Sequence, residues 1–245
     1  DAEGGDEFLH PAELRQDPYS SLAVIQRLVA MGYLPASADD QQRAVEIAGA
    51  ESRFNLAVVH MHHRRPEKAR ELLEALHAEF PDEPRYALRL AKAHFELGSD
   101  DRALEIVEGL GARGQRSAGS DMVRLGALLR RDCLVEAEAL IREAQERYPP
   151  SAALQYFVGH LLLMQKHASM AQAAFERAIQ LDQDFVLGHN GLAQALLMQG
   201  DHKAAAESAL RAIGLTYFFP QAHYHLGKAL AGLGEPERAI RSLEI

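Results

Sequence analysis

The sequence predicts an all-α fold, a right-handed α-solenoid of tandem helix–turn–helix repeats. A unit of 34 residues recurs without a gap from residue 50 to the end of the 245-residue chain. Small and apolar residues return at the same places of each unit, three or four residues apart, so they share one face of a helix. A period of this size indicates stacked two-helix units instead of a single globular core.

The first 49 residues precede the repeats and are predicted to form a helical capping segment. Asp17-Pro18 marks a helix start, because proline is favoured in the first turn, and Gly32 ends the apolar stretch that follows. Ser37 with Asp40 resembles a capping box, and we expect the next helix to run directly into the first repeat. This segment would cover the apolar face of that repeat, as the end of a solenoid requires.

Six repeats follow, and the sixth is cut short: 50–83, 84–117, 118–151, 152–185, 186–219 and 220–245. The eighth residue is small in all but one of them. The twentieth residue is always alanine: Ala69, Ala103, Ala137, Ala171, Ala205 and Ala239. Small residues at these two places let the backbones of the two helices approach closely, while larger apolar residues beside them fill the space between repeats.

The turn between the two helices is predicted at Gly98, Gly200 and Gly234 in three repeats. Glycine accepts the left-handed conformation that ends a helix without steric cost. Pro81 and Pro149 stand at the ends of repeats, where they stop the second helix.

The third repeat departs from the pattern. It has Arg124 and Leu125 where an apolar and a small residue are expected, and it follows the glycine-rich stretch 109–120. Because glycine raises the entropy cost of ordering, we predict a hinge or an irregular joint between the second and third repeats.

Residues 188–215 and 222–243 resemble the tetratricopeptide repeat (TPR) family, and the register extends over residues 50–245. The tryptophan usual in the first helix of this family is absent, and His189 and His223 fill its place in two repeats. The resemblance implies a non-catalytic scaffold that binds a protein or peptide.

The first helices of stacked repeats line the concave side, so a binding groove is expected there. Places two, five, nine and twelve of each repeat should face it. Tyrosine offers contact area with a polar tip, and Asn or Gln pairs with a peptide backbone. For each residue the alternative is an ordinary solvated side chain. The candidates are Arg85, Lys92, Tyr156, His160, Asn190, Gln194, Tyr224 and Lys228.

Some members of this family capture a C-terminal carboxylate with Lys and Asn in one repeat and further basic residues in the next two. Here Arg85, Arg89 and Lys92 form a basic patch in the second repeat, but the third repeat does not continue it. We therefore expect weak or no binding to the acidic chaperone tails that such clamps recognise.

Candidate chemistry is sparse, so we predict no catalytic residue, cofactor or metal. The stretch 60–65 (HMHHRR) spreads its histidines over different faces of one helix, which does not suit a metal site. The stretch 109–114 (GLGARG) follows a helix and not a strand, so it reads as a linker and not as a dinucleotide loop. Most histidines recur at equivalent places of the repeats, which favours packing or groove roles. Cys133 is the single cysteine and excludes an internal disulfide.

A second resemblance concerns residues 22–34 (LAVIQRLVAMGYL), which are similar to the closing segment of sulfatase- and phosphodiesterase-type domains of the alkaline phosphatase superfamily. It implies an alternative function, in which this chain is the C-terminal regulatory or substrate-recruiting region of a larger bacterial hydrolase. The catalytic domain would then be absent here.

Charge and the chain ends give expectations about partners. The formal net charge of −9 excludes general binding to nucleic acid, and no apolar run is long enough to insert into a membrane. The first residue is Asp1, so we expect an excised fragment; its location is open, with the cytoplasm favoured. Ala239, Ile240 and Leu243 end the last repeat without a cap, so we expect either further chain or self-association through this repeat.

Overall fold

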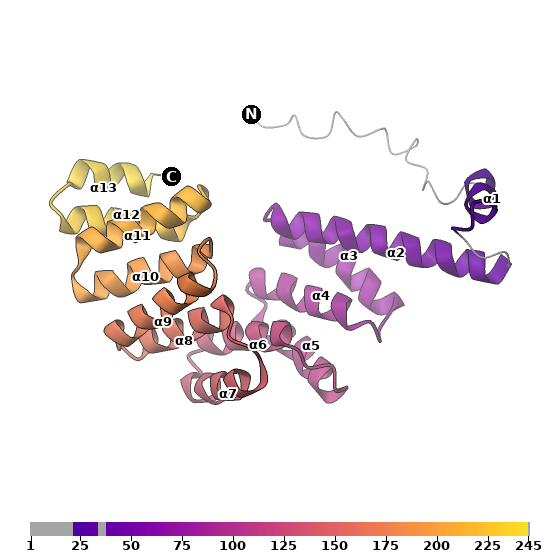
Figure 1. The fold of residues 1–245 in the computed structure, drawn as a ribbon, viewed down its shortest axis with the longest axis horizontal. Helices are drawn as coiled ribbons and strands as arrows, with labels where there is room; N and C mark the ends of the chain where they lie inside the picture. The colour runs from indigo at the N-terminus through magenta and orange to yellow at the C-terminus, as the bar shows by residue number, and fades with distance from the viewer. Residues whose placement is uncertain (1–21, 34–37, 245) are drawn as a thin grey trace. The chain divides into compact units, whose positions relative to one another are not determined.

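The computed structural model describes residues 22–33 and 38–244, and these form thirteen α-helices and no strand (Figure 1). The chain is therefore all-α, a solenoid of tandem helix pairs, as the sequence predicts. It divides into two compact units between Leu97 and Gly98. The predicted helix start at Asp17-Pro18, the residue Ser37 and the side chain of Asp40 lie outside the described part.

The first unit holds four helices: α1 (Leu22–Ala30), α2 (Ala38–His62), α3 (Pro66–Glu79) and α4 (Pro84–Glu96). Gly32 follows α1 with a φ of 74°, so the predicted stop is confirmed. Helix α2 continues without a break across residues 49 and 50, and the helix before the first repeat does run into it. Proline opens both α3 and α4, where its missing N–H costs no hydrogen bond.

The second unit is a stack of helices in which each packs against the next along the chain. The first helices of successive repeats also contact one another, α6 with α8, α8 with α10 and α10 with α12. The helices of this unit are α5 (Asp100–Ala112), α6 (Ala118–Arg130), α7 (Leu134–Arg147), α8 (Ala152–Met164), α9 (Ala168–Leu181), α10 (Val186–Gln199), α11 (His202–Leu215), α12 (Pro220–Gly232) and α13 (Pro236–Leu243).

The small residues of the repeat lie where the two helices of a pair meet. All six alanines of the twentieth place are buried. In the fourth repeat the eighth place is Gly159, and the ring of Phe175 lies directly on it, since a Cβ built there would come within 2.6 Å of the ring. Gly191 on α10 faces the same ring, so one aromatic side chain fills the space that two glycines leave.

The same turn joins the two helices of every repeat, although only three repeats have glycine there. Gly98, Gly200 and Gly234 have φ between 76° and 81°, as predicted. The other three repeats hold a non-glycine residue with positive φ at the same place: Arg64, Asp132 and Lys166. The packing of the helix pair therefore imposes the left-handed conformation even where the side chain disfavours it.

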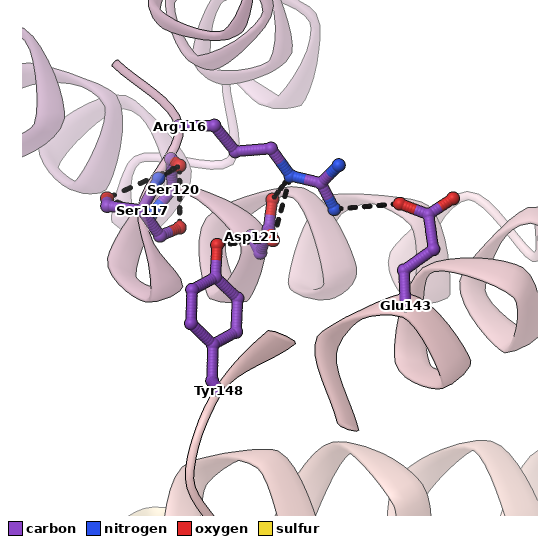
Figure 2. Close-up of polar contacts among 6 residues, drawn as sticks. All are labelled: Arg116, Ser117, Ser120, Asp121, Glu143 and Tyr148. Carbon is purple, nitrogen blue, oxygen red and sulfur yellow. Dashed lines mark hydrogen bonds and ion pairs between the residues drawn. The ribbon is translucent and has the colours of Figure 1, made fainter. Parts of the chain in front are cut away.

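The joint between α5 and α6 contains a buried polar cluster (Figure 2). Arg116 donates from Nε to both carboxylate oxygens of Asp121, at 2.8 and 3.0 Å, and the Tyr148 hydroxyl donates to the same carboxylate at 3.0 Å. Asp121 and then Glu143, 3.0 Å from the guanidinium, raise the pKa of Arg116. Ser117 caps α6 by accepting from the backbone of Ser120.

Three residues of this cluster, Arg116, Ser117 and Ser120, lie in the glycine-rich stretch where the sequence predicts a hinge. The boundary between the two compact units falls one helix earlier, between Leu97 and Gly98. Motion at residues 109–120 stays a prediction, and in the structure Asp121 connects Arg116 of this stretch with Tyr148.

Candidate functional site

Five of the eight predicted groove residues line one hollow of about 580 Å³ in the second unit. Three successive first helices supply them. Tyr156 and His160 come from α8, Asn190 and Gln194 from α10, and Tyr224 from α12. The spacing of 34 residues brings equivalent places of neighbouring repeats side by side, so residues far apart in sequence meet on one surface.

The other three candidates lie elsewhere. Lys228 is one turn beyond Tyr224 on α12, with its Nζ 5.5 Å from the centre of the tyrosine ring. Arg85 and Lys92 lie on α4, in the first unit. The hollow therefore involves only the fourth, fifth and sixth repeats.

Tyr156 forms the aromatic wall of the hollow. Its ring centre lies 6.0 Å from that of Phe175 and 6.1 Å from that of Phe185, which fixes the side chain by packing. Burial raises the pKa of Tyr156, so its hydroxyl is protonated at neutral pH. None of the described residues forms a hydrogen bond with that hydroxyl, which leaves it available to a bound molecule.

A buried hydrogen bond joins two of the repeats at the floor of the hollow. Nδ1 of His225 and Oδ1 of Asn190 are 2.9 Å apart. Burial, with a smaller contribution from the charge of Lys228, lowers the pKa of His225 to about 4, so the ring is neutral at pH 7 and donates from Nδ1. Oδ1 of Asn190 is thus already used, and its amide hydrogens remain as donors.

The lining of the hollow carries no Asp, Glu, Lys or Arg among the described residues. Burial also lowers the pKa of His160, which favours its neutral form. The buried Nδ1 of His160 has no hydrogen-bond partner in the described structure. An uncharged surface with unused donors and aromatic walls suits an uncharged, polar-backboned ligand more than a charged group.

Four lining residues were not among the sequence candidates: Gly191, Pro220, Gln221 and His225. Gln221 occupies the second place of the sixth repeat, which is one of the four places expected to face the groove, so its position could have been predicted from the sequence. Gly191 and His225 both occupy the sixth place, which the rule omits. The sixth place contributes because it follows the groove-facing fifth place by a single residue on the same helix.

The basic patch of the first unit is partly neutralised. Arg85 forms an ion pair with Glu51, and hydrogen bonding to this carboxylate raises the pKa of Arg85. Glu51 and Arg85 are 34 residues apart, so both occupy the second place of their repeats. An acidic and a basic residue at the same place of successive repeats are the sequence signal from which this ion pair could have been predicted. Burial and then the neighbouring Arg89 lower the pKa of Lys92.

The fourth place of three repeats ties the first helix to the loop before it. Nε2 of His189 donates to the carbonyl of Gln183 at 2.9 Å, and Nε2 of His223 donates to that of Tyr217 at 2.8 Å. In the third repeat Asp121 makes the corresponding contact with Arg116. The two histidines that stand in the place of tryptophan therefore have a packing role.

The histidines of residues 60–65 lie at the end of α2, with His60 half-buried and His62 and His63 exposed. No group of three or more His, Cys, Asp or Glu side chains in the described ranges is placed to hold a metal ion. No helix within residues 22–33 and 38–244 is both long and apolar enough to cross a membrane.

Comparison with known proteins gives two matches to family models, both described as tetratricopeptide repeat. They cover residues 60–124 and 159–216, together just over half of the chain. No curated protein matches the chain.

Solved structures give the same fold. TTC0263, a TPR protein of Thermus thermophilus, is 24% identical with a TM-score of 0.66; the match covers 74% of this chain and 99% of that one. A TPR protein of Parabacteroides merdae ATCC 43184 is 16% identical with a TM-score of 0.65, covering 90% and 88%. The APC/C hetero-tetramer Cut9–Hcn1 is 12% identical with a TM-score of 0.72, covering 91% and 48%. At these identities the likeness concerns the fold alone.

The resemblance of residues 22–34 to a hydrolase segment is not tested by these matches. Of that stretch, residues 22–33 form α1 and the turn after it. The hydrolase-appendage alternative therefore stays a prediction.

Proposed function

Because the chain belongs to the tetratricopeptide repeat family, whose repeats are protein-interaction scaffolds, we propose that its second unit binds an extended segment of another protein. The proposed site is the hollow between α8, α10 and α12. The observation that carries the proposal is the meeting of five predicted groove residues from three repeats on one surface. Proteins of this fold are generally non-catalytic, and the proposed role is binding without chemistry.

The two amides on α10 support an extended ligand. Asn190 and Gln194 are one helical turn apart, about 6 Å along the axis. Two residues of an extended strand span about 6.6 Å, so each amide can meet the backbone of alternate ligand residues. Because the Asn190 carbonyl already accepts from His225, this side chain offers donors to ligand carbonyls.

The uncharged lining supports an internal segment as the ligand. A chain terminus or an acidic tail brings a charge that needs an ionic partner when it is desolvated. The hollow offers none among its lining residues, and the Nζ of Lys228, one turn beyond Tyr224, lies over the ring of that tyrosine. The expected ligand is a neutral stretch whose apolar or aromatic side chains contact Tyr156 and Tyr224.

Selection from a library of displayed ten-residue peptides tests this proposal. We expect uncharged peptides to be enriched on the wild-type chain, and the affinity of one selected synthetic peptide is then measured by calorimetry. The double substitution Tyr224→Ala with Gln194→Ala removes an exposed aromatic and an amide, which should weaken binding at least tenfold, about 1.4 kcal/mol.

Tyr33→Ala is the control, since it removes an exposed tyrosine of the first unit, and it should leave the affinity unchanged. Tyr156 is left intact because its ring packs against Phe175 and its loss would disturb the core. Equal affinity of the wild type and the double variant for the selected peptide would exclude the hollow as the site.

A further inference from the structure

A crevice of about 300 Å³ lies between α5 and α6, where the second repeat meets the third. The two helices pack against each other, and the loop that joins them closes one side of the space. Three lining residues come from α5, one from the loop and three from α6. None of them lines the hollow between α8, α10 and α12.

The crevice is open because the sequence departs from the repeat at the twenty-eighth place. In the fourth repeat this place is Ile179, whose side chain packs on Gly188 of the next first helix, 3.2 Å from a Cβ built there. The second repeat has Gly111 instead, and a Cβ built on it meets no atom within 4 Å. The side chain that would fill the space between α5 and α6 is therefore missing.

A second departure is Arg124, at the seventh place of the third repeat. The other five repeats have leucine or valine there, and Leu226 of the sixth packs in a cluster with Ala209 of the repeat before it. The corresponding neighbour of Arg124 is Val107, which is buried and lines the crevice. A charged group thus stands where the other repeats have an apolar one. Departures from an otherwise consistent pattern are typical of functional or strained sites.

Arg124 and Glu108 bring opposite charges to the crevice, and neither forms a hydrogen bond or ion pair with a residue that the structure describes. Arg124 is half-buried on α6, and Glu108 is exposed on α5. The other charges of the lining are paired with each other, since Arg116 donates to Asp121 (Figure 2). A half-buried cation has lost hydration without gaining an ionic contact, so the guanidinium of Arg124 is available to a bound carboxylate.

We propose that this crevice binds a free α-amino acid with an aliphatic side chain. The ligand carboxylate pairs with Arg124, whose guanidinium can hold it through two parallel hydrogen bonds, and the ligand ammonium group pairs with Glu108. The ligand side chain occupies the space over Gly111, beside Val107, which isoleucine fills in the fourth repeat.

A ligand that carries both charges suits this lining better than a ligand with one. The lining offers one unpaired charge of each sign, so an anion would also meet Glu108 and a cation would also meet Arg124. The volume of the crevice lies at the lower end of the range for small-molecule sites, which matches a ligand of this size. Binding here does not involve the hollow, so this proposal and the proposed peptide binding can fail independently.

Calorimetric titration of the chain with isoleucine is the first test. We expect a Kd of about 1 mM or tighter, because so small a ligand has few atoms that contribute to binding. 3-Methylpentanoate lacks the ammonium group and 2-methylbutylamine lacks the carboxylate, so each should bind more weakly by about tenfold or more. No detectable binding of isoleucine overturns the proposal, and so does an analogue that binds as tightly as isoleucine.

Two variants that restore the pattern of the repeat test the location. Arg124→Leu removes the partner of the ligand carboxylate, and Gly111→Ile fills the crevice with the side chain of the fourth repeat. Each should bind isoleucine more weakly by about tenfold or more, with a Tm equal to or above that of the wild type. Arg142→Leu is the matched control, because Arg142 is exposed on α7 and does not line the crevice. Wild-type affinity of Arg124→Leu or of Gly111→Ile would place isoleucine elsewhere and overturn the proposal.

Glu108→Gln tests the partner of the ammonium group. This variant should bind isoleucine and 3-methylpentanoate with similar affinity, because the charge that distinguishes the two ligands is gone. Glu105→Gln is its control, since Glu105 lies one turn earlier on α5, pairs with Arg102 and does not line the crevice. If Glu108→Gln retains the full preference of the wild type for isoleucine, the proposed pairing is wrong.

Discussion

The side chain of Phe175 shows how single residues define the core of this chain. Its ring is fully buried, and it lies on Gly159 of its own repeat and on Gly191 of the next. The fifth repeat has Ala193 at the eighth place, whereas the fourth has glycine, and the larger ring at the twenty-fourth place takes up the volume. Protein interiors are packed densely enough that such exchanges must be matched.

Replacing Gly159 by alanine should destabilise the second unit by about 1–3 kcal/mol, because the added methyl group overlaps the ring of Phe175. Thermal and urea unfolding followed by circular dichroism measures the change. Gly109→Ala on α5 is the control, since no atom lies within 4 Å of the added Cβ. That substitution should be neutral or stabilise the chain by about 0.5–1 kcal/mol, because alanine favours the helix. Equal effects of the two substitutions would contradict the packing argument.

At the scale of the helix pair, the turn between the two helices has the same left-handed conformation in every repeat. It is formed by glycine in three repeats and by a residue with a side chain in the other three. Gly200 adopts positive φ freely, whereas Lys166 adopts it against the preference of its side chain. The sequence predicted the turn only where glycine stands. It did not predict the left-handed conformation at Arg64, because no local preference marks this residue; the packing of the two helices determines its conformation.

Lys166→Gly should therefore stabilise the chain. Relief of the left-handed strain contributes about 1–2 kcal/mol, and the greater freedom of glycine in the unfolded chain offsets about 0.5–1 kcal/mol of it. A net gain of about 0.5–1 kcal/mol corresponds to a Tm increase of a few degrees at most. Lys203→Gly, an exposed lysine on α11, makes the same chemical change within a helix and should lower stability by about 1 kcal/mol. A loss of stability on Lys166→Gly would refute the strain at this turn.

At the scale of the whole molecule, the joint between the second and third repeats decides how the stack continues. The glycines of residues 109–120 suggest a hinge, yet Asp121 is buried there and accepts from Arg116 and Tyr148. Tyr148 comes from the far end of the third repeat, so the cluster closes over the first helix of that repeat. These contacts tie Arg116 and Tyr148 to the first helix of the third repeat and oppose motion at the joint.

Asp121→Ala should cost about 1–3 kcal/mol, because it removes the hydrogen bonds that the partly exposed guanidinium of Arg116 and the hydroxyl of Tyr148 make to this carboxylate. Hydrogen exchange should then accelerate at the start of α6 before it does elsewhere in the second unit. Glu143→Ala removes the exposed partner of the same guanidinium and should cost less than about 1 kcal/mol. Similar exchange rates at residues 113–121 in the Asp121→Ala and Glu143→Ala variants would show that the cluster does not hold the joint.

The fold follows from the sequence because a repeat places the same residue types at the same places many times over. The places of the small residues and the helix pairs are therefore predictable, and so are five of the residues that line the hollow. The contacts that cannot be predicted from the sequence are those that depart from the repeat. Asp121 forms a hydrogen bond with Arg116, five residues before it. Asn190 forms one with His225, which is 35 residues later, one more than the period. Such contacts depend on three-dimensional packing and carry no signature in the spacing.

Helix α2 has a mechanical consequence. Its 25 residues span about 38 Å, whereas the 14 residues of its partner α3 span about 21 Å, so the N-terminal part of α2 extends beyond the hairpin that they form (Figure 1). A continuous helix transmits force and torque along its axis with little bending. A segment attached to the N-terminal end of α2 is thus rigidly coupled to the rest of this helix. A rotation of that segment about the axis of α2 therefore changes how α2 packs against α3 in the first repeat.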